Sequence, residues 1–275
     1  MTDLSKATKS RDERRGLELS LPPWLASLLL LVVLLAGWEG YVRLAEVNWC
    51  ILPPPSVAPQ ECAEMLRART PWFHTWITGL ETLLGFAFAV VIGVGFGALM
   101  GKMRRVEQTL HPFVVATQVI PKIALVPLFI VWFGFGLTPK VVIAAVLAFF
   151  PILVNTTLGF KSVYRGHREV MLSLNSSRWQ TITQLELPSA LPYILTGMEM
   201  GIVLSIIGAV VGEFLGGSQG LGVLAVQEMN SFNTTALFGI IIHLSVVGFI
   251  FYALLVGCRR FLIPWHESVQ INAKK

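Results

Sequence analysis

Charged residues are scarce in this chain of 275 residues: Asp, Glu, Lys and Arg make up 13% of it, whereas 54% is hydrophobic. A soluble domain of this size could not cover so many apolar side chains, so the composition excludes that class of protein. Cysteine is also rare, and Cys50, Cys62 and Cys258 do not have the spacing of a metal site. Cys50 and Cys62 could pair in an oxidising compartment, although unpaired thiols are favoured. The shortage of charge predicts that lipid is the main solvent of the chain.

Long apolar runs are what the sequence has instead. A helix that spans the bilayer needs about 20 mainly apolar residues, because every backbone amide must be satisfied within the segment. Six stretches meet this requirement, and they cover about 24–45, 76–100, 112–134, 139–160, 191–214 and 236–258. We therefore predict an all-α membrane protein with one transmembrane domain over residues 23–265. A disordered tail at 1–22 precedes this domain and a short tail at 266–275 follows it.

The basic residues lie in alternate loops between these stretches. Sixteen Lys and Arg residues fall in the two tails and in the loops after the second and fourth spans. The opposite loops hold only Arg43, Arg67, Arg69 and Lys140. Because cytoplasmic loops carry the excess of Lys and Arg, both termini are predicted to be cytoplasmic. The net charge of +5 therefore indicates an orientation in the membrane and not a nucleic-acid partner.

Three further charged residues, Glu81, Lys122 and Glu199, fall inside the predicted spans. A charge within the membrane should face the bundle interior or a wet cavity, so each is a candidate for a translocation pathway. Structural ion pairs explain them equally well. Lys122 lies between Pro121 and Pro127, which bend the third span, and from a broken helix its side chain could also reach the interface.

Small residues recur at every fourth position of two spans, which places them on one face of each helix and lets another backbone approach closely. They are Ala89, Gly93, Gly97 and Gly101 in the second span, and Gly208, Gly212 and Gly216 in the fifth. Packing within one chain is favoured over an interface between two copies.

The connection between the fourth and fifth spans, residues 161–190, is far longer than two neighbouring helices need, so it should have structure of its own. It reads as two short helices, the first over about 163–174. Asn175 follows, and Asn tolerates the left-handed conformation found at helix ends. Ser177 and Gln180 have the spacing of a capping box that opens the second helix.

The second helix carries Trp179, Ile182 and Leu185 at helical spacing, which predicts an apolar ridge on the cytoplasmic side. The pair Leu187-Pro188 is expected to end this helix before the fifth span begins.

This loop resembles the coupling motif of bacterial ABC import permeases, which reads Glu-Ala-Ala, then glycine after three residues, then Ile-x-Leu-Pro after nine. Here the motif stands as Glu169-Val170-Met171, Asn175 and Leu185-Glu186-Leu187-Pro188. The spacing matches throughout, and the departures are Val170, Met171 and Asn175. Other runs resemble the nitrate, taurine and sulfonate branch of these permeases. They lie at 52–56, 120–128, 132–136, 149–151, 213–214 and 220–222.

The resemblance implies the six-helix bundle of a type I ABC importer permease, with a cytoplasmic coupling helix between spans 4 and 5. It implies a homodimeric channel in the bacterial inner membrane, two cytoplasmic ATPase subunits, and an external or periplasmic substrate-binding protein. The residues expected to contact the ATPase are Glu169, Asn175, Trp179, Ile182, Leu185, Leu187 and Pro188. Related permeases transport nitrate, bicarbonate, sulfonates, thiamine pyrimidines and riboflavin. The amino-acid sequence of this chain most resembles the permeases for vitamin precursors.

No catalytic, cofactor or metal site is expected in this chain, because ATP would bind to the partner subunit. The string Gly97 to Lys102 has one residue too few between its glycines for a phosphate-binding loop. The string Gly216 to Gly220 matches a nucleophile elbow, but that motif needs a soluble α/β domain. The alternative function is a secondary transporter or channel driven by an ion gradient, in which Lys122, Glu81 and Glu199 would be the coupling groups.

Overall fold

The computed structural model describes residues 22–67 and 70–263, and within these ranges every regular element is helical. The chain forms two compact units, one ending at Val57 and the other beginning at Ala58. Five helices are long and apolar enough to cross a membrane, and a sharply bent pair makes a sixth crossing if it is counted as one span. The prediction of an all-α membrane protein is therefore confirmed, and the six predicted spans correspond to these five helices and the bent pair. The two predicted tails lie outside the described residues, except for residue 22.

The first unit consists of helix α2 (Pro23–Leu44) and the proline-rich segment after it. The carboxylate of Glu39 joins these parts, because it pairs with Arg43 at 2.6 Å and accepts hydrogen bonds from the amide and hydroxyl of Ser56. The segment after α2 is thus held against the last turns of the helix, and Pro53 and Pro54 are buried there.

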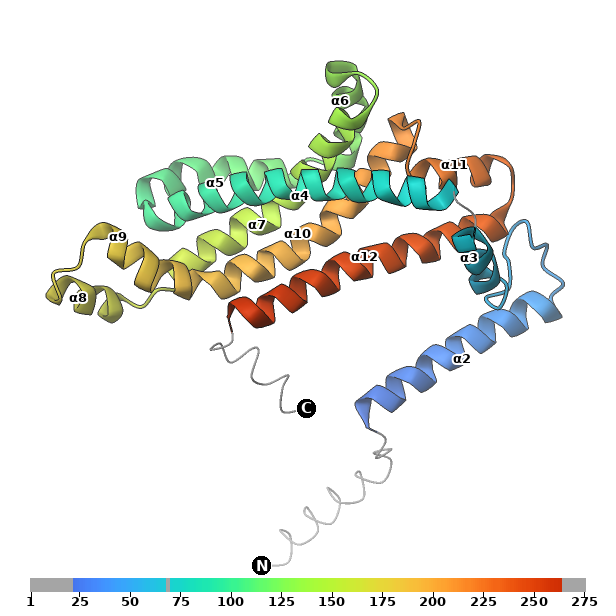
Figure 1. Ribbon diagram of the computed structural model, residues 1–275, viewed down its shortest axis with the longest axis horizontal. Helices are drawn as coiled ribbons and strands as arrows, with labels where there is room; N and C mark the ends of the chain where they lie inside the picture. The colour runs from blue at the N-terminus through green and yellow to red at the C-terminus, as the bar shows by residue number, and fades with distance from the viewer. Residues whose placement is uncertain (1–21, 68–69, 264–275) are drawn as a thin grey trace, which may run out of the picture. The chain divides into compact units, whose positions relative to one another are not determined.

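Three helices form the centre of the second unit: α4 (Thr70–Lys102), α7 (Leu137–Lys161) and α10 (Leu187–Gly216). They lie side by side in Figure 1, and the glycine stripes explain how closely they pack. A Cβ atom at Gly97 would lie 2.6 Å from the Cβ of Thr156 on α7, and one at Gly208 would lie 2.7 Å from the Cα of Ala144. The stripes therefore pack helices within one chain, as the sequence favoured.

The predicted third span, about 112–134, is broken into two parts. Helix α5 (Arg104–Val119) ends before Pro121, and a short 3₁₀ turn, η2 (Lys122–Leu125), leads into α6 (Val126–Phe133). The two parts are bent by 85°. The sequence predicted a bend here, but not the complete break in the helix. Pro121 lacks the amide that would bond back to α5 and its ring clashes with the preceding turn, so the helix stops there.

The remaining helices occupy the two ends of the second unit (Figure 1). At one end lie α8 (Arg165–Ser173) and α9 (Arg178–Thr181), next to the last turns of α4 and α7. At the other end lies α11 (Leu221–Asn230), and α12 (Thr234–Leu262) runs back from there along α10. Helix α3 (Ala58–Arg67) packs against α12. We call these the α8–α9 end and the α11 end.

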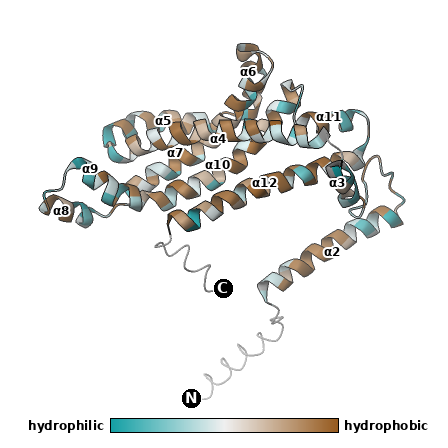
Figure 2. Cartoon of the chain, in the orientation of Figure 1, coloured by the Kyte–Doolittle hydropathy of each residue, from teal (hydrophilic) through white to brown (hydrophobic). Residues whose placement is uncertain are grey.

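The hydropathy of the residues also differs between the middle and the ends of the second unit. Hydrophobic residues cover the long helices, whereas hydrophilic residues concentrate at α3, at α8 and α9, and at the start of α5 (Figure 2). All the basic residues that were predicted to be cytoplasmic and that the structure describes belong to the α8–α9 end or to the helix termini beside it. They are Lys102, Arg104, Arg105, Lys161, Arg165, Arg168, Arg178, Arg259 and Arg260.

Candidate functional site

The loop that carries the motif folds as the local sequence signals predict. Helix α8 ends at Ser173, and Asn175 adopts the left-handed conformation with φ of 52°. The hydroxyl of Ser177 then accepts the amide of Gln180, while the Gln180 side chain accepts the amide of Ser177. This capping box opens α9, so the turn between α8 and α9 is fixed by local hydrogen bonds.

Helices α8 and α9 present large apolar side chains to their surroundings. Trp179 is 72% exposed, and Tyr164, Val170, Leu172 and Leu174 are also exposed. In a membrane protein, exposed apolar residues outside the spans mark contacts with a partner or with the membrane surface. Of the predicted contact residues, Glu169 and Asn175 share this exposed region, whereas Ile182, Leu185 and Pro188 are partly buried where α9 joins α10.

The expected end of the second helix at Leu187-Pro188 is wrong. After α9 the chain makes a π-helical turn, Ile182–Glu186, and continues directly into α10. The helical segment from Arg178 to Gly216 is therefore 39 residues long. Pro188 lies in the first turn of α10. The wider π turn before it shifts the backbone hydrogen-bond pattern, so no hydrogen bond from the amide of residue 188 is needed and proline is tolerated. The second helix of the loop is thus continuous with the fifth span.

Glu186 ties this extension to the rest of the second unit. Its carboxylate is buried, with Oε2 at 2.7 Å from Nζ of Lys102 on α4 and Oε1 at 3.5 Å from Nη2 of Arg168 on α8. Arg168 also donates to the carbonyl of Phe160 at the end of α7. One carboxylate therefore joins α4, α8 and the start of α10. Sequence reasoning assigned no functional role to Glu186, although its position between two leucines in an otherwise apolar motif was an available signal.

The three charges inside the spans do not meet. Nζ of Lys122 lies 4.7 Å from the centre of the Phe150 ring. Glu199 on α10 pairs with Arg259 on α12, with Oε1 at 2.9 Å from Nη1. Glu81 pairs elsewhere, so the structure does not assemble the single set of coupling groups that an ion-driven transporter would need.

The partner of Glu81 is Lys140, which was predicted to lie in an external loop. Lys140 instead belongs to the first turn of α7, which begins at Leu137, and its side chain is buried. Its Nζ lies 2.7 Å from Oε1 of Glu81 and 3.0 Å from the carbonyl oxygen of Gln219. A buried ammonium thus joins α4, α7 and the turn before α11.

The turn before α11 is held by a second buried carboxylate. Glu213 on α10 accepts the hydroxyl of Thr78 at 2.6 Å and the amide of Gly222 at 2.6 Å. Thr78 in turn accepts the amide of Leu221. Gly220 has φ of 124°, and a Cβ atom there would lie 2.0 Å from the Glu213 carboxylate, so only glycine fits. The contacts of this turn involve the runs at 213–214 and 220–222 that resemble those of the related permeases.

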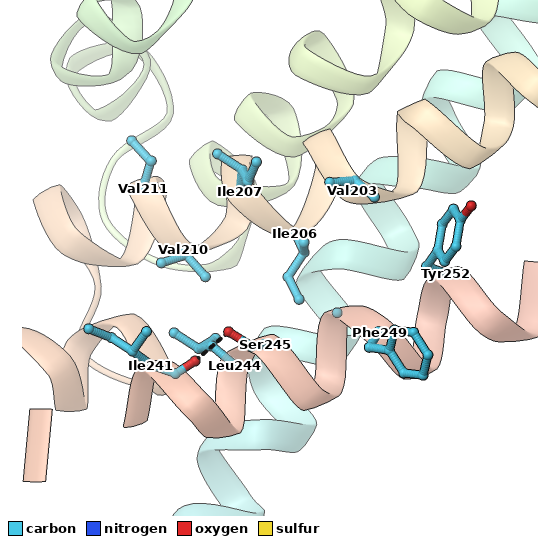
Figure 3. Close-up of a pocket in the computed structure, with 11 residues that line it drawn as sticks. Val203, Ile206, Ile207, Val210, Val211, Ile241, Leu244, Ser245, Phe249 and Tyr252 are labelled. Atoms are coloured by element: carbon cyan, nitrogen blue, oxygen red, sulfur yellow. Dashed lines mark hydrogen bonds between the residues drawn. The ribbon is translucent and has the colours of Figure 1, made fainter. Parts of the chain in front are cut away.

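A groove of about 560 Å³ runs between α10 and α12 (Figure 3). Its walls are almost entirely aliphatic or aromatic, and the hydroxyl of Ser245 is engaged by the carbonyl of Ile241 at 2.8 Å. Such a surface matches lipid chains or apolar helices and offers no groups for holding an ionic solute. The lining residues are Val203, Ile206, Ile207, Val210, Val211, Ile241, Leu244, Ser245, Gly248, Phe249 and Tyr252.

Comparison with known proteins agrees with the motif in the α8–α9 loop. Residues 89–262 match the family described as binding-protein-dependent transport system inner membrane component. The chain is 34% identical over 249 residues to the formylaminopyrimidine transport permease protein ThiX of Halalkalibacterium halodurans, covering 90% of this chain and 97% of that one. It is 36% identical over 238 residues to the riboflavin transport system permease protein RibX of Chloroflexus aurantiacus, covering 86% and 89%.

The fold also has a solved counterpart. A chain of the MetNI methionine ABC transporter in an inward-facing conformation superimposes with a TM-score of 0.60 at 20% identity, covering 69% of this chain and 94% of that chain. Together with the sequence matches, this likeness confirms the resemblance drawn from the motif and does not favour the ion-driven alternative. The chain belongs to the binding-protein-dependent transport system inner membrane components, and it is the permease subunit of an ABC importer.

Proposed function

We propose that this permease is driven by ATPase subunits that bind to α8 and α9 on the cytoplasmic side. The observation that carries the proposal is the exposed apolar surface of these helices, centred on Trp179 and held in place by Glu186. Exposed aromatic anchors of this kind usually dominate the energy of a protein interface. The string Gly97 to Lys102 is continuous helix within α4, so we infer that ATP is bound and hydrolysed by the partner.

Movement of α9 would be transmitted without a flexible joint. The segment Arg178 to Gly216 has 39 residues, which corresponds to about 58 Å of helix at 1.5 Å per residue. Glu186 adds ion pairs to Lys102 and Arg168, so α4 and α8 would follow. We infer that ATP-driven movement of the ATPases tilts α10 and α4 together and thereby opens one end of the pathway and closes the other.

The pathway is proposed to form between two copies of this chain, with one ATPase subunit on each. The groove beside α10 and α12 is too apolar to conduct an ionic solute, which supports a route outside the single subunit. The concentration of Lys and Arg at the α8–α9 end supports a cytoplasmic position for that end and for both termini. A substrate-binding protein would then deliver the solute at the α11 end.

The proposed solute is a small nitrogen heterocycle of the vitamin-precursor type. The support is the similarity to ThiX and RibX, whose names give formylaminopyrimidine and riboflavin as solutes. The chain is also 30% identical to the taurine transport system permease protein TauC of Escherichia coli, so taurine is the competing candidate solute.

Replacement of the main anchor tests the coupling proposal. We expect Trp179→Ala to leave the protein in the membrane but to weaken ATPase binding by about 2 kcal/mol or more, or roughly 30-fold. The measurement is the amount of ATPase subunit that co-purifies from membranes after co-expression, together with solute-stimulated ATP hydrolysis. Phe232→Ala is the matched control for co-purification, because Phe232 is 78% exposed but lies in the turn after α11, away from α8 and α9.

Equal co-purification of the ATPase with the Trp179 variant, the Phe232 variant and the unmodified chain would refute the coupling assignment. The solute proposal has its own test, which is uptake by the complete importer of labelled formylaminopyrimidine, riboflavin, taurine and nitrate. Uptake of taurine or nitrate alone would refute the heterocycle.

A further inference from the structure

A cavity of about 740 Å³ lies at the α8–α9 end, between the junction of α4 with α5 and the junction of α7 with α8. It shares no lining residue with the apolar groove of Figure 3. Five of its lining residues are basic: Lys102, Arg104, Lys161, Arg165 and Arg168. Glu107 is the acidic residue in its wall. We call this space the basic cavity.

The internal ion pairs do not use up this positive charge. Glu107 pairs with Lys161, while Glu186 serves both Lys102 and Arg168. Within the described part of the chain, Arg104 and Arg165 form no ion pair. The five basic side chains therefore face two carboxylates, which leaves three positive charges unmatched, and an anion with two negative charges would offset most of this excess. Two guanidinium groups, one at the start of α5 and one at the start of α8, suit an oxygen-rich anion, because each presents a planar set of donors.

The backbone adds to the attraction for an anion. Arg104 is the first residue of α5, a helix of 16 residues whose first turn has no side-chain cap. The amides of an uncapped first turn carry partial positive charge, which favours phosphate oxygens. The volume of the cavity is within the range of small-molecule sites, so it has room for a phosphate and the group attached to it.

We propose that the basic cavity binds a phosphate monoester or diester, held mainly by Arg104 and Arg165. Because Arg104 begins α5 and Arg165 begins α8, a bound phosphate would link the third span to the loop that carries the coupling motif. The phosphate could belong to a soluble phosphorylated compound or to the headgroup of an anionic phospholipid, and these sources are distinguished by experiment.

The test uses the full chain in nanodiscs, with Arg104→Gln combined with Arg165→Gln. These arginines form no ion pair with described residues, so their replacement leaves the internal pairs intact. Arg105→Gln is the matched control, because Arg105 is adjacent and exposed but does not line the cavity. In nanodiscs of phosphatidylcholine, glycerol 1-phosphate is titrated by calorimetry. In a second arm, native mass spectrometry counts phosphatidylglycerol retained from mixed nanodiscs.

Binding of glycerol 1-phosphate that weakens at least tenfold in the double variant, and less than twofold in the control, supports the soluble source. Retention of phosphatidylglycerol by the unmodified chain and the control, with loss in the double variant, supports the lipid source. The proposal is overturned if neither probe binds, or if the double variant and the control behave alike, since binding would then reflect overall charge. Neither result depends on ATPase coupling, so this inference stands or fails apart from the proposed function.

Discussion

The buried pair of Glu81 and Lys140 gives the sharpest test of the structure. Lys140→Met would leave the carboxylate of Glu81 without its ammonium partner, in a site where the side chains of Lys140 and Glu81 are 5% and 1% exposed. Removing one member of a buried ion pair costs about 3–5 kcal/mol. The lost bond to the Gln219 carbonyl, which is 3.0 Å from Nζ of Lys140, adds about 1 kcal/mol. Glu213 is close enough to Glu81 to interact with it, so two carboxylates would then share the site.

The assay is thermal unfolding of the purified protein in detergent, followed by loss of helical circular dichroism. At about 2–4 °C per kcal/mol, the combined loss of about 4–6 kcal/mol for Lys140→Met should lower the midpoint by roughly 8–24 °C. The double variant Glu81→Gln with Lys140→Met should recover more than half of that loss, because no unpaired charge remains. Lys122→Met is the control for the substitution itself, since Lys122 has a ring contact worth about 1 kcal/mol.

A shift of less than about 2 °C for Lys140→Met would refute this account of the pair. So would a double variant no more stable than Lys140→Met alone, because the cost would then come from lost packing and not from the stranded carboxylate.

Two further predictions concern helix contacts. Gly97→Ala should destabilise the protein by about 1–3 kcal/mol, because the new Cβ would lie 2.6 Å from the Cβ of Thr156. Gly95→Ala on the same helix is the control, because its Cβ meets nothing within 4 Å, and it should be neutral or slightly stabilising. Equal unfolding midpoints for the two variants would contradict the packing of α4 on α7. Glu199→Gln should lower stability by about 1–3 kcal/mol through its pair with Arg259 while uptake persists at low temperature; lost uptake at unchanged stability would instead support a place in the pathway.

Features that depend on near neighbours in the chain were predictable. The capping box of Ser177 and Gln180 and the left-handed Asn175 follow from interactions within a few residues, and both occur in the structure. The coupling motif was recognisable for the same reason, since its spacing reflects one short stretch of chain. The glycine stripe ending at Gly101 was also visible, because the helical period alone places its members on one face.

The pairing of distant charges was not predictable in this way. Glu81 and Lys140 are far apart in sequence, and whether they meet depends on where α7 begins and on how α4 and α7 are rotated against each other. The same holds for Glu186, whose partners come from α4 and α8. A hydropathy pattern gives the length of a span but not its rotation, so it marks such charges as unusual without naming their partners.

Composition and local sequence pattern by themselves determined that this protein is embedded in the lipid bilayer, crosses it with six helical segments and carries an importer motif in one loop. Those properties depend on hydrophobic length and on hydrogen bonds between near neighbours. Only the tertiary structure decided that the motif helix continues into α10, that Glu186 fixes it to α4, and that Lys140 is a buried partner of Glu81. Each of these depends on contacts between helices, whose geometry is set by the packing of the whole bundle.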